Sequence, residues 1–335
     1  MSGRILKVVE IERLAFEALR AAGTVAPAAA SLARAVAAAE RDGIRSHGLA
    51  YLPTYVEHVR CGKVDGAAHP TLTRVRPSTV VVDAATGFAH PAIDLGFATL
   101  IPAARETGCA GMAVRNSYNC GVLGYHVEHL AEAGLVGLGF TNSPASIAPV
   151  GGRAPVLGTN PFALAVPGEG GPAFVVDQSS SVVAKSEIMM RARREEPIPE
   201  GWALDAGGAP TTEAKAALAG SMMPSGGYKG FGVALLVEVL AAALAGAALG
   251  KDASPFSGTE GGPPRTGQFF LALEPDGFAG GAFADRIQSL VQAIEADGGG
   301  RLPGSRRMAA RARAGTDGVE IDPTLIERIE ALKSA

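Results

Sequence analysis

Apolar residues recur at helical spacing near both ends of the chain. One face of residues 8–22 is apolar, and Gly23 closes that run, as expected for an amphipathic helix with a glycine stop. Comparable patterns predict further helices over residues 27–42, 49–61, 283–296 and 323–333. Pro27 and the Asp322-Pro323 pair are typical helix starts. The first three helices are expected to form a small helical unit.

From Thr71 onward the apolar period shortens to that of strands. Predicted strands cover residues 71–75, 80–82, 111–114, 136–140, 162–166, 174–176 and 269–273, and helical stretches cover residues 91–107, 124–133 and 231–249. Isolated strands with few helices between them indicate an α+β fold rather than regular βαβ winding.

Residues 231–250 are apolar over a length that could span a bilayer. Glu238 lies near the middle, alanine and glycine dominate, and flanking aromatic anchors are missing. The pattern therefore favours a buried helix in a soluble protein over a membrane span.

Composition excludes several classes of function. Hydrophobic residues make up 47% and charged residues 19% of the 335 positions, which is typical of a soluble globular protein, and the length suggests about two domains. A net charge of −3 and 5% aromatic residues favour neither nucleic acid nor an anionic membrane. Three scattered cysteines give neither a disulfide framework nor a metal site, and no secretory signal is evident at the start. We expect a cytoplasmic protein.

The turn Arg41–Gly48 (RDGIRSHG) carries the most chemistry in the chain. It joins the end of an alanine-rich helical run to a glycine-bounded turn that holds Ser46 and His47. Histidine exchanges protons near neutral pH, and the adjacent serine can extend its hydrogen bonding. An exposed polar turn is the alternative, but polar clusters elsewhere supply partners for the imidazole.

Four such clusters stand out. Two are the turn Gly158–Pro161 (GTNP) and the segment Asp177–Ser181, which ends a predicted strand and leads to Lys185-Ser186-Glu187. The others are Pro224–Gly230, before the long apolar helix, and the arginine-rich run Arg301–Arg313. Glycines and helix starts permit close approach to an anionic ligand, and arginine matches phosphate geometry. Ordinary turns and solvated helices remain alternatives at each cluster.

The glycines of Gly134-Leu-Val-Gly137-Leu-Gly139 are not a dinucleotide fingerprint. Their order is wrong, and they lie inside a strand-like run rather than between a strand and a helix. A nucleotide would therefore bind to this chain on a scaffold other than the Rossmann fold.

Together the motifs resemble the type-2 malate/L-lactate dehydrogenase family, and within it the Δ1-piperideine-2-carboxylate/Δ1-pyrroline-2-carboxylate reductases. The resemblance covers nearly the whole chain, with RDGIRSHG, VDAATGFAHPA, GTNP, PEGWALDAGGAPTT, GGYKG and RLPGSRR in order. It implies a sulfolactate dehydrogenase-like fold without a Rossmann motif, in which a helical domain from both chain ends packs on a large, mostly antiparallel sheet. The implied domains are residues 1–70 with 284–335, and residues 71–283.

The resemblance also implies roles for individual residues. His47 would donate a proton, with Ser46 beside it and Glu187 as the carboxylate of the relay. Substrate contacts would come from Thr159, Tyr51, Arg45, Lys185 and Ser186. The implied cofactor contacts are Asn119, Cys120, Gly121, Val122, Leu123, Asp177, Gln178, Ser179, Gly227, Tyr228, Lys229, Arg301, Gly304, Arg306 and Arg307.

Two departures from the family pattern bear on the substrate. Asn119 stands where the family usually has histidine, and Tyr51 stands where the reductases have an arginine for the substrate carboxylate. The expected reaction is reduction of a cyclic imino acid, with 2-hydroxy-acid dehydrogenation of the malate or lactate type as the alternative. A protein that only binds nucleotide or a partner is a further alternative. The arginine run favours NADPH over NADH, and the family habit implies a homodimer.

Overall fold

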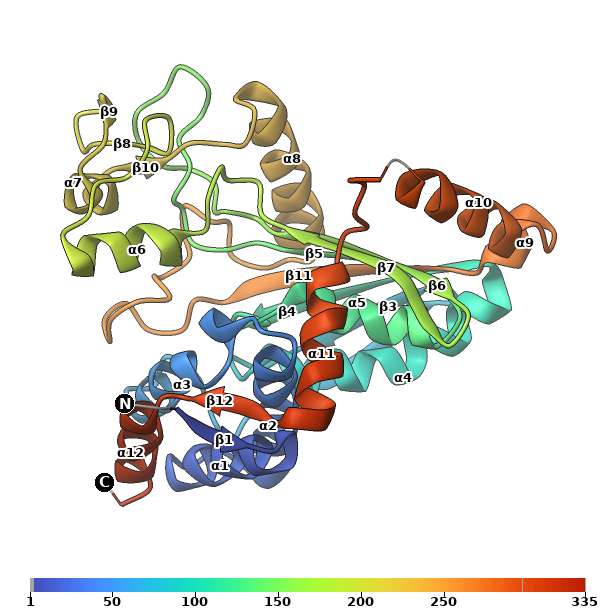
Figure 1. Ribbon diagram of the computed structural model, residues 1–335, viewed down its shortest axis with the longest axis horizontal. Helices are drawn as coiled ribbons and strands as arrows, with labels where there is room; N and C mark the ends of the chain where they lie inside the picture. The colour runs from blue at the N-terminus through green and yellow to red at the C-terminus, as the bar shows by residue number, and fades with distance from the viewer. Residues whose placement is uncertain (1–2, 297, 335) are drawn as a thin grey trace.

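The computed structural model describes residues 3–296 and 298–334. Its centre is a seven-stranded sheet with the order β2-β3-β4-β11-β5-β6-β7 (Figure 1). The strands are β2 (Thr71–Arg76), β3 (Thr79–Asp83), β4 (Cys109–Ser117), β5 (Val136–Thr141), β6 (Phe162–Gly168), β7 (Gly171–Gln178) and β11 (Thr266–Leu273). Neighbouring strands are antiparallel except β3 and β4, which are parallel. The predicted α+β class is confirmed, and so is each predicted strand.

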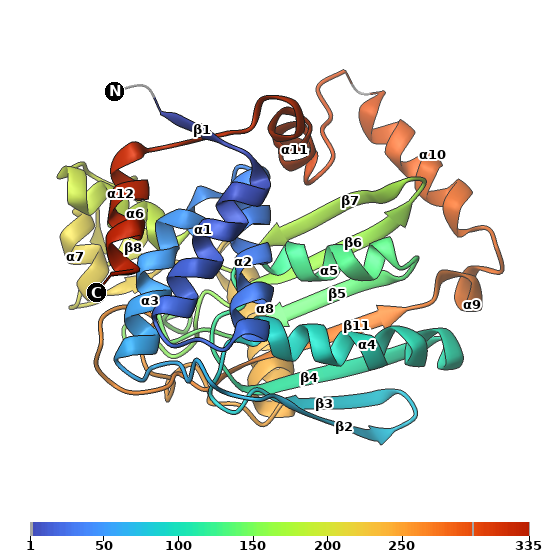
Figure 2. The same ribbon diagram turned by 90° about the horizontal axis from the view of Figure 1, so that it is seen from below.

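Two helices cover one face of this sheet, as Figures 1 and 2 show: α4 (Ala89–Thr107) and α5 (Leu123–Glu132). Helix α4 is the crossover that the parallel pair β3 and β4 requires. Glycine allows the helices to approach closely, because a Cβ at Gly137 or Gly139 would collide with the side chains of α5. The glycines between 134 and 139 therefore serve helix–sheet packing.

The opposite face carries α8 (Tyr228–Glu238) and its π-helical continuation η3 (Val239–Leu244). Val237 and Ala241 are buried against Phe140 of β5. The prediction of one buried helix over residues 231–249 is wrong in part. The helix ends at Leu244, just before the left-handed Gly246, and one side of it is exposed. No helix in the described part of the chain is long and apolar enough to cross a membrane.

The two chain ends meet in a second core. It contains α1 (Val8–Ala21), α2 (Ala26–Arg41), α3 (Leu52–Arg60), α12 (Pro323–Leu332) and the strand pair β1 (Arg4–Leu6) with β12 (Val319–Ile321). The side chain of Asp322 caps α12 by accepting from the backbone N–H of Thr324 (2.9 Å). The helices α9 (Pro275–Ala279) and α10 (Phe283–Glu295) lie at the far end of the sheet (Figure 2). The domain boundaries stay a prediction.

A third, smaller core was not evident from the sequence. It contains α6 (Lys185–Arg194) and α7 (Ala214–Ala219) with the short strands β8 (Ala203–Leu204), β9 (Pro210–Thr211) and β10 (Ser221–Met222). Strands of two residues carry no periodic signal, which explains the omission. The arginine-rich run forms α11 (Ser305–Asp317), beside α2 and the end of β7.

Candidate active site

The predicted catalytic turn follows α2 as two short 3-10 turns, η1 (Arg45–His47) and η2 (Leu49–Tyr51). The buried carboxylate of Glu40 accepts a hydrogen bond from the backbone N–H of Leu49 (2.7 Å). A side chain at Gly48 would overlap that carboxylate, so glycine is required there. Glu40 thereby fixes the turn to the end of α2.

His47 has one ring nitrogen held by its neighbour. The hydroxyl of Ser46 lies 3.0 Å from Nδ1. Desolvation by the surrounding protein lowers the pKa of His47 although its ring keeps an exposed edge, and the negative charge of Asp177 partly offsets that effect. His47 is therefore mostly neutral at pH 7, and it lies within the field of Asp177. Arg45 points elsewhere, since its guanidinium donates to the carbonyl of Glu320 (3.3 Å).

Asp177 is the point where three distant segments meet. It is the penultimate residue of β7. Its Oδ2 accepts from the backbone N–H of Gly124 in the first turn of α5 (2.8 Å) and from Nη2 of Arg307 (3.1 Å). A Cβ at Gly124 would lie 2.7 Å from both Oδ2 of Asp177 and Nη1 of Arg307. That Nη1 is buried and has no hydrogen-bond partner among the described residues. A buried guanidinium N–H beside a glycine and a helix start fits an anionic cofactor group.

Helix α11 is held in place by Arg311, one helical turn after Arg307. Its guanidinium contacts both carboxylate oxygens of Asp42, at 3.0 and 2.7 Å, and both of Glu128, at 2.5 and 2.9 Å. These acids raise the pKa of Arg311, and the arginine contacts hold the pKa of Asp42 below its usual range although burial opposes this. The arginine run is therefore partly structural, and Arg301 and Arg306 remain exposed.

A pocket of about 440 Å³ lies beside the end of β7. It joins two segments that the sequence placed in the cofactor site, through Gln178 and Ser179 on one side and Lys229 on the other. The residues lining it are Phe162, Gln178, Ser179, Ser180, Ser181, Val182, Val183, Ala184, Ser225, Lys229, Gly230 and Val233. Tyr228 is 70% exposed, and Gly227 adopts the left-handed φ of 65° before α8. Hydroxyl groups and one ammonium make this pocket suitable for a polar, anionic ligand.

Asn119 and Tyr51, the two departures from the reductase pattern, contact each other. Nδ2 of Asn119 donates to the hydroxyl of Tyr51 (3.5 Å), and its Oδ1 accepts from the hydroxyl of Tyr55 (3.1 Å) and the N–H of Gly121 (3.2 Å). Burial raises the pKa of the Tyr51 hydroxyl, which therefore stays neutral. The pair offers hydrogen bonds to a substrate without adding a charge.

The rest of the segment 119–123 contributes backbone and packing. Cys120 is buried, and burial raises the pKa of its thiol to about 12, so no thiolate forms at neutral pH. Its carbonyl accepts from Nε2 of the buried His126 (2.9 Å). Leu123 is part of the buried core, and Val122 occupies the N-cap position of α5 without a side-chain hydrogen bond.

The GTNP turn lies next to the same strand end. The hydroxyl of Thr159 is 3.3 Å from that of Ser143, and its carbonyl accepts from the N–H of Ser180 (2.8 Å). The buried side chain of Asn160, at a φ of 41°, donates to Glu238 (2.8 Å) and thereby fixes the turn to α8. Glu238, the acid within the apolar helix, is thus a structural anchor.

The predicted relay carboxylate is engaged elsewhere. Oε1 of Glu187 pairs with Nε of Arg191 one turn along α6 (3.1 Å), and among the described residues no hydrogen bond joins Glu187 to His47. Lys185 and Ser186 begin the same helix. Desolvation alone lowers the pKa of Lys185, although its side chain keeps an exposed part, and no carboxylate offsets that effect. A substrate carboxylate would supply the counter-charge.

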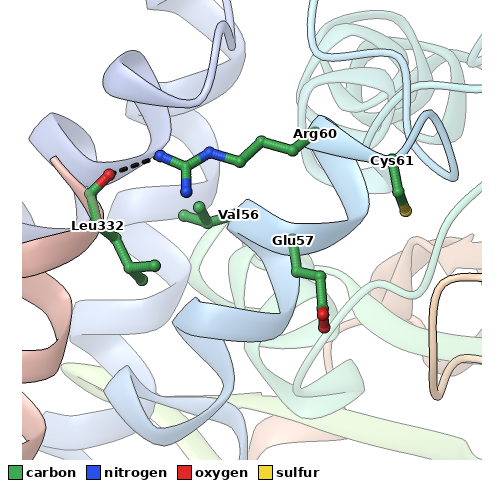
Figure 3. Close-up of a pocket in the computed structure, with 5 residues that line it drawn as sticks. All are labelled: Val56, Glu57, Arg60, Cys61 and Leu332. Carbon is green, nitrogen blue, oxygen red and sulfur yellow. Dashed lines mark hydrogen bonds between the residues drawn. The ribbon is translucent and has the colours of Figure 1, made fainter. Parts of the chain in front are cut away.

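A second hollow, of about 360 Å³, lies in the helical unit between α3 and α12 (Figure 3). Arg60 donates across it to the carbonyl of Leu332 (2.6 Å). Its lining of Val56, Glu57, Arg60, Cys61 and Leu332 includes no residue of the predicted site. Polar and charged residues of the predicted site gather instead at the end of β7.

Comparison with known proteins identifies the family of the chain. The family profile for malate/L-lactate dehydrogenase matches residues 6–330. The chain belongs to the malate/L-lactate dehydrogenase family. It is therefore an oxidoreductase that uses a nicotinamide cofactor, and the α+β fold without a Rossmann motif is the one expected for this family.

Two relatives differ in substrate. A (2R)-3-sulfolactate dehydrogenase (NADP(+)) of Chromohalobacter salexigens is 44% identical over 98% of both chains. A Δ1-pyrroline-2-carboxylate reductase of Ancylobacter novellus is 39% identical over 98% of this chain and 97% of its own. Among solved structures, the Δ1-piperideine-2-carboxylate reductase of Pseudomonas syringae pvar. tomato superimposes with a TM-score of 0.94, at 36% identity over 98% of this chain and 99% of that one.

Several residues that hold the predicted site in place were not predicted from the sequence. Glu40, Asp42, Gly124 and Glu128 act through contacts with segments far away in the chain. A signal was present for the acids alone, because charged residues on otherwise apolar helical faces are seldom buried without a partner.

Proposed function

We propose that the protein is an NADPH-dependent reductase of cyclic imino acids such as Δ1-pyrroline-2-carboxylate and Δ1-piperideine-2-carboxylate. The observation that carries this proposal is the meeting of Asp177 of β7 with the start of α5 and with Arg307, near enough to His47 for the charge of Asp177 to act on its ring. Relatives with this activity, 38–39% identical over most of the chain, support the substrate class.

The bound nicotinamide would supply a hydride to C2 of the imine. The task of this chain is to add a proton to the imine nitrogen, so that the C=N bond becomes C–N and an amino acid such as proline or pipecolate forms. His47 donates that proton, with Ser46 orienting its ring through Nδ1. Glu187 would join the relay only after releasing Arg191.

The substrate carboxylate needs a cation, and Tyr51 supplies none. We assign this role to Lys185, because it begins α6 directly after Ala184, which lines the pocket beside the end of β7. Ser186 and Thr159 would add hydrogen bonds, and Tyr51 would be a neutral contact, since its hydroxyl proton is donated to the carbonyl of Phe256. Arg45 is a weaker candidate since it already contacts Glu320.

For the cofactor, Arg307 with its free N–H and the first turn of α5 would hold phosphate oxygens. The exposed Arg301 and Arg306 near the same helix start support a 2′-phosphate and hence NADPH. Gly304 lets this segment pass close to β7, since a Cβ there would lie 3.0 Å from the carbonyl of Val175.

A second candidate function is NADP-dependent oxidation of a 2-hydroxy acid. The 44% identity to a (2R)-3-sulfolactate dehydrogenase favours it. The substrate of that dehydrogenase, 3-sulfolactate, has two anionic groups. The proposed site offers two lysines at separate positions, Lys185 and Lys229.

One assay separates the two. Initial rates of NADPH oxidation would be compared for Δ1-pyrroline-2-carboxylate, Δ1-piperideine-2-carboxylate, pyruvate, oxaloacetate and 3-sulfopyruvate. Faster turnover of a cyclic imine supports the reductase, and turnover of open oxo acids alone would replace it with the hydroxy-acid function. A preference for NADH of tenfold or more would contradict the cofactor proposal.

We also propose a homodimer. The exposed side of α8 and η3 presents Leu235, Leu236, Val239 and Leu244, each about half exposed. An apolar stripe of this kind on a soluble protein is typical of an interface. Light scattering during size-exclusion chromatography would test it, and a monomer at micromolar concentration would contradict it.

A further inference from the structure

A long loop between η3 and β11 is bound to the helical unit by three side chains. We call residues Ser254–Gly262 the strap; it is the orange loop beside α3 in Figures 1 and 2. The hydroxyl of Ser254 closes its base by donating to the carbonyl of Gly262 (2.6 Å). Most of its own side chains are exposed, so its position depends on what binds its backbone.

Three alternate carbonyls in the middle of the strap accept hydrogen bonds from the helical unit. Tyr51 donates to Phe256 (3.3 Å), Nε2 of His58 to Gly258 (2.9 Å) and Nζ of Lys63 to Glu260 (2.6 Å). The donors are spread over the start of α3, its interior and the segment after it, so the strap is held along its length rather than at one point.

Two of the three anchors are fully buried polar groups. His58 and Lys63 have exposed fractions of 0%. A buried ammonium without a partner is strongly unfavourable, so the carbonyl of Glu260 is a required partner for Lys63. If the strap moved away from the helical unit, these two side chains would become exposed or would lose their hydrogen-bond partners in the strap.

His58 also contacts Tyr118, the residue before Asn119. Its Nδ1 lies 2.5 Å from the hydroxyl of Tyr118. Since Nε2 donates to Gly258, Nδ1 of the neutral ring accepts the Tyr118 proton. The ring centroid of Tyr118 lies 5.3 Å from that of Phe256 in the strap and 6.1 Å from that of Tyr55. The hydroxyl of Tyr55 donates to Asn119. A continuous set of contacts thus joins the strap to Asn119 and Tyr51.

We propose that the strap forms one wall of the substrate site, and that His58 is the residue that positions this wall together with Tyr51 and Asn119. The inference rests on the proposed function for the identity of the substrate. It assigns Tyr51 a double task, because its hydroxyl holds Phe256 in the strap and receives the amide of Asn119. Substrate size would then be selected by a neutral wall rather than by a charged group.

The test compares three variants. His58→Ala removes both bonds, whereas His58→Gln keeps a donor for Gly258 and an acceptor for Tyr118 without a titrating ring. His69→Ala is the matched control, since His69 is exposed and lies outside the site. We would measure kcat and KM for the favoured substrate, the Kd of NADPH, and amide hydrogen exchange of residues 254–262.

We expect His58→Ala to raise KM by about tenfold, with the NADPH Kd within about twofold of wild type and faster exchange in the strap. His58→Gln should restore KM to within about threefold of wild type. Unchanged KM in a folded His58→Ala protein with faster strap exchange would overturn the wall assignment. A rise in KM matched by an equal rise in the Kd of NADPH, and not reversed in His58→Gln, would also overturn it, because that pattern indicates general unfolding.

If His58→Ala does not fold, Tyr118→Phe serves instead, because it removes only the hydroxyl that His58 accepts. An unchanged KM in that variant would contradict the inference. A wild-type protein that reduces neither cyclic imines nor 2-oxo acids defeats the proposed function, and the wall assignment with it. Normal wild-type turnover with insensitive variants defeats the wall assignment alone.

Discussion

The guanidinium of Arg307 lies 3.1 Å from the carboxylate of Asp177, although 130 residues separate them in the chain. The pair is largely buried and is completed by the N–H of Gly124. These contacts join the edge strand β7, helix α5 and helix α11 at one point. That point lies within the electrostatic reach of His47.

Replacement of Arg307 by alanine should therefore weaken NADPH binding. The change removes a buried N–H that would meet a phosphate oxygen and leaves Asp177 without its partner. We expect the Kd for NADPH to rise by at least about tenfold. Fluorescence titration measures it, and Arg313→Ala, an exposed residue of the same helix, is the control. Equal affinities in both variants would remove Arg307 from the cofactor site.

Replacement of His47 by asparagine should reduce kcat with little effect on cofactor binding. Loss of a general acid costs about 10²- to 10⁴-fold in rate. Wild-type kcat should also decline on the alkaline side of the lowered His47 pKa, because less of the protonated form remains. Steady-state rates between pH 5 and 9 check both points. An asparagine variant that retains full kcat would exclude His47 as the acid.

Arg311→Met should destabilise the protein by about 3–5 kcal/mol, because Glu128 would be left as a buried charge without an ion-pair partner and Asp42 would keep only Arg41. The native pKa of Asp42 is lowered, so this contact stabilises the fold above the ordinary aspartate value and is lost as pH falls through the native one. Urea unfolding at pH 7 measures the difference. A loss below about 1 kcal/mol would show that the network is not structural.

His126 should make the fold sensitive to acid. Burial lowers its pKa from 6.5 to about 4, so the unfolded chain binds a proton that the native ring refuses. Stability from this group is complete above pH 6.5 and falls as pH drops toward 4, by ~3 kcal/mol in all. His126→Gln keeps a donor for the carbonyl of Cys120 and should flatten the decline. If the urea midpoints of the wild type and of His126→Gln fell by the same amount between pH 6.5 and pH 4, the role of His126 would be contradicted.

The pattern of residues was sufficient for much of the fold. Strands such as β5 and β11 alternate or are continuously apolar, and they form where the pattern predicts them. The helix formed by α8 and η3 ends at Leu244, earlier than the predicted residue 249. The apolar pattern does not reveal that Gly246 closes this helix or which of its sides stays exposed. The small sheet of β8, β9 and β10 was missed because two-residue strands have no period.

The sequence by itself determined which residue types are available for chemistry, such as the Ser46-His47 pair and the arginine run, since these are local motifs. Only the tertiary structure decided their partners. It joined Asp177 to Gly124 and Arg307, used Arg311 for Asp42 and Glu128, and paired Glu187 with Arg191 rather than with His47. Each of these choices depends on burial and on distances between remote segments, and the order of residues along a chain does not encode them locally.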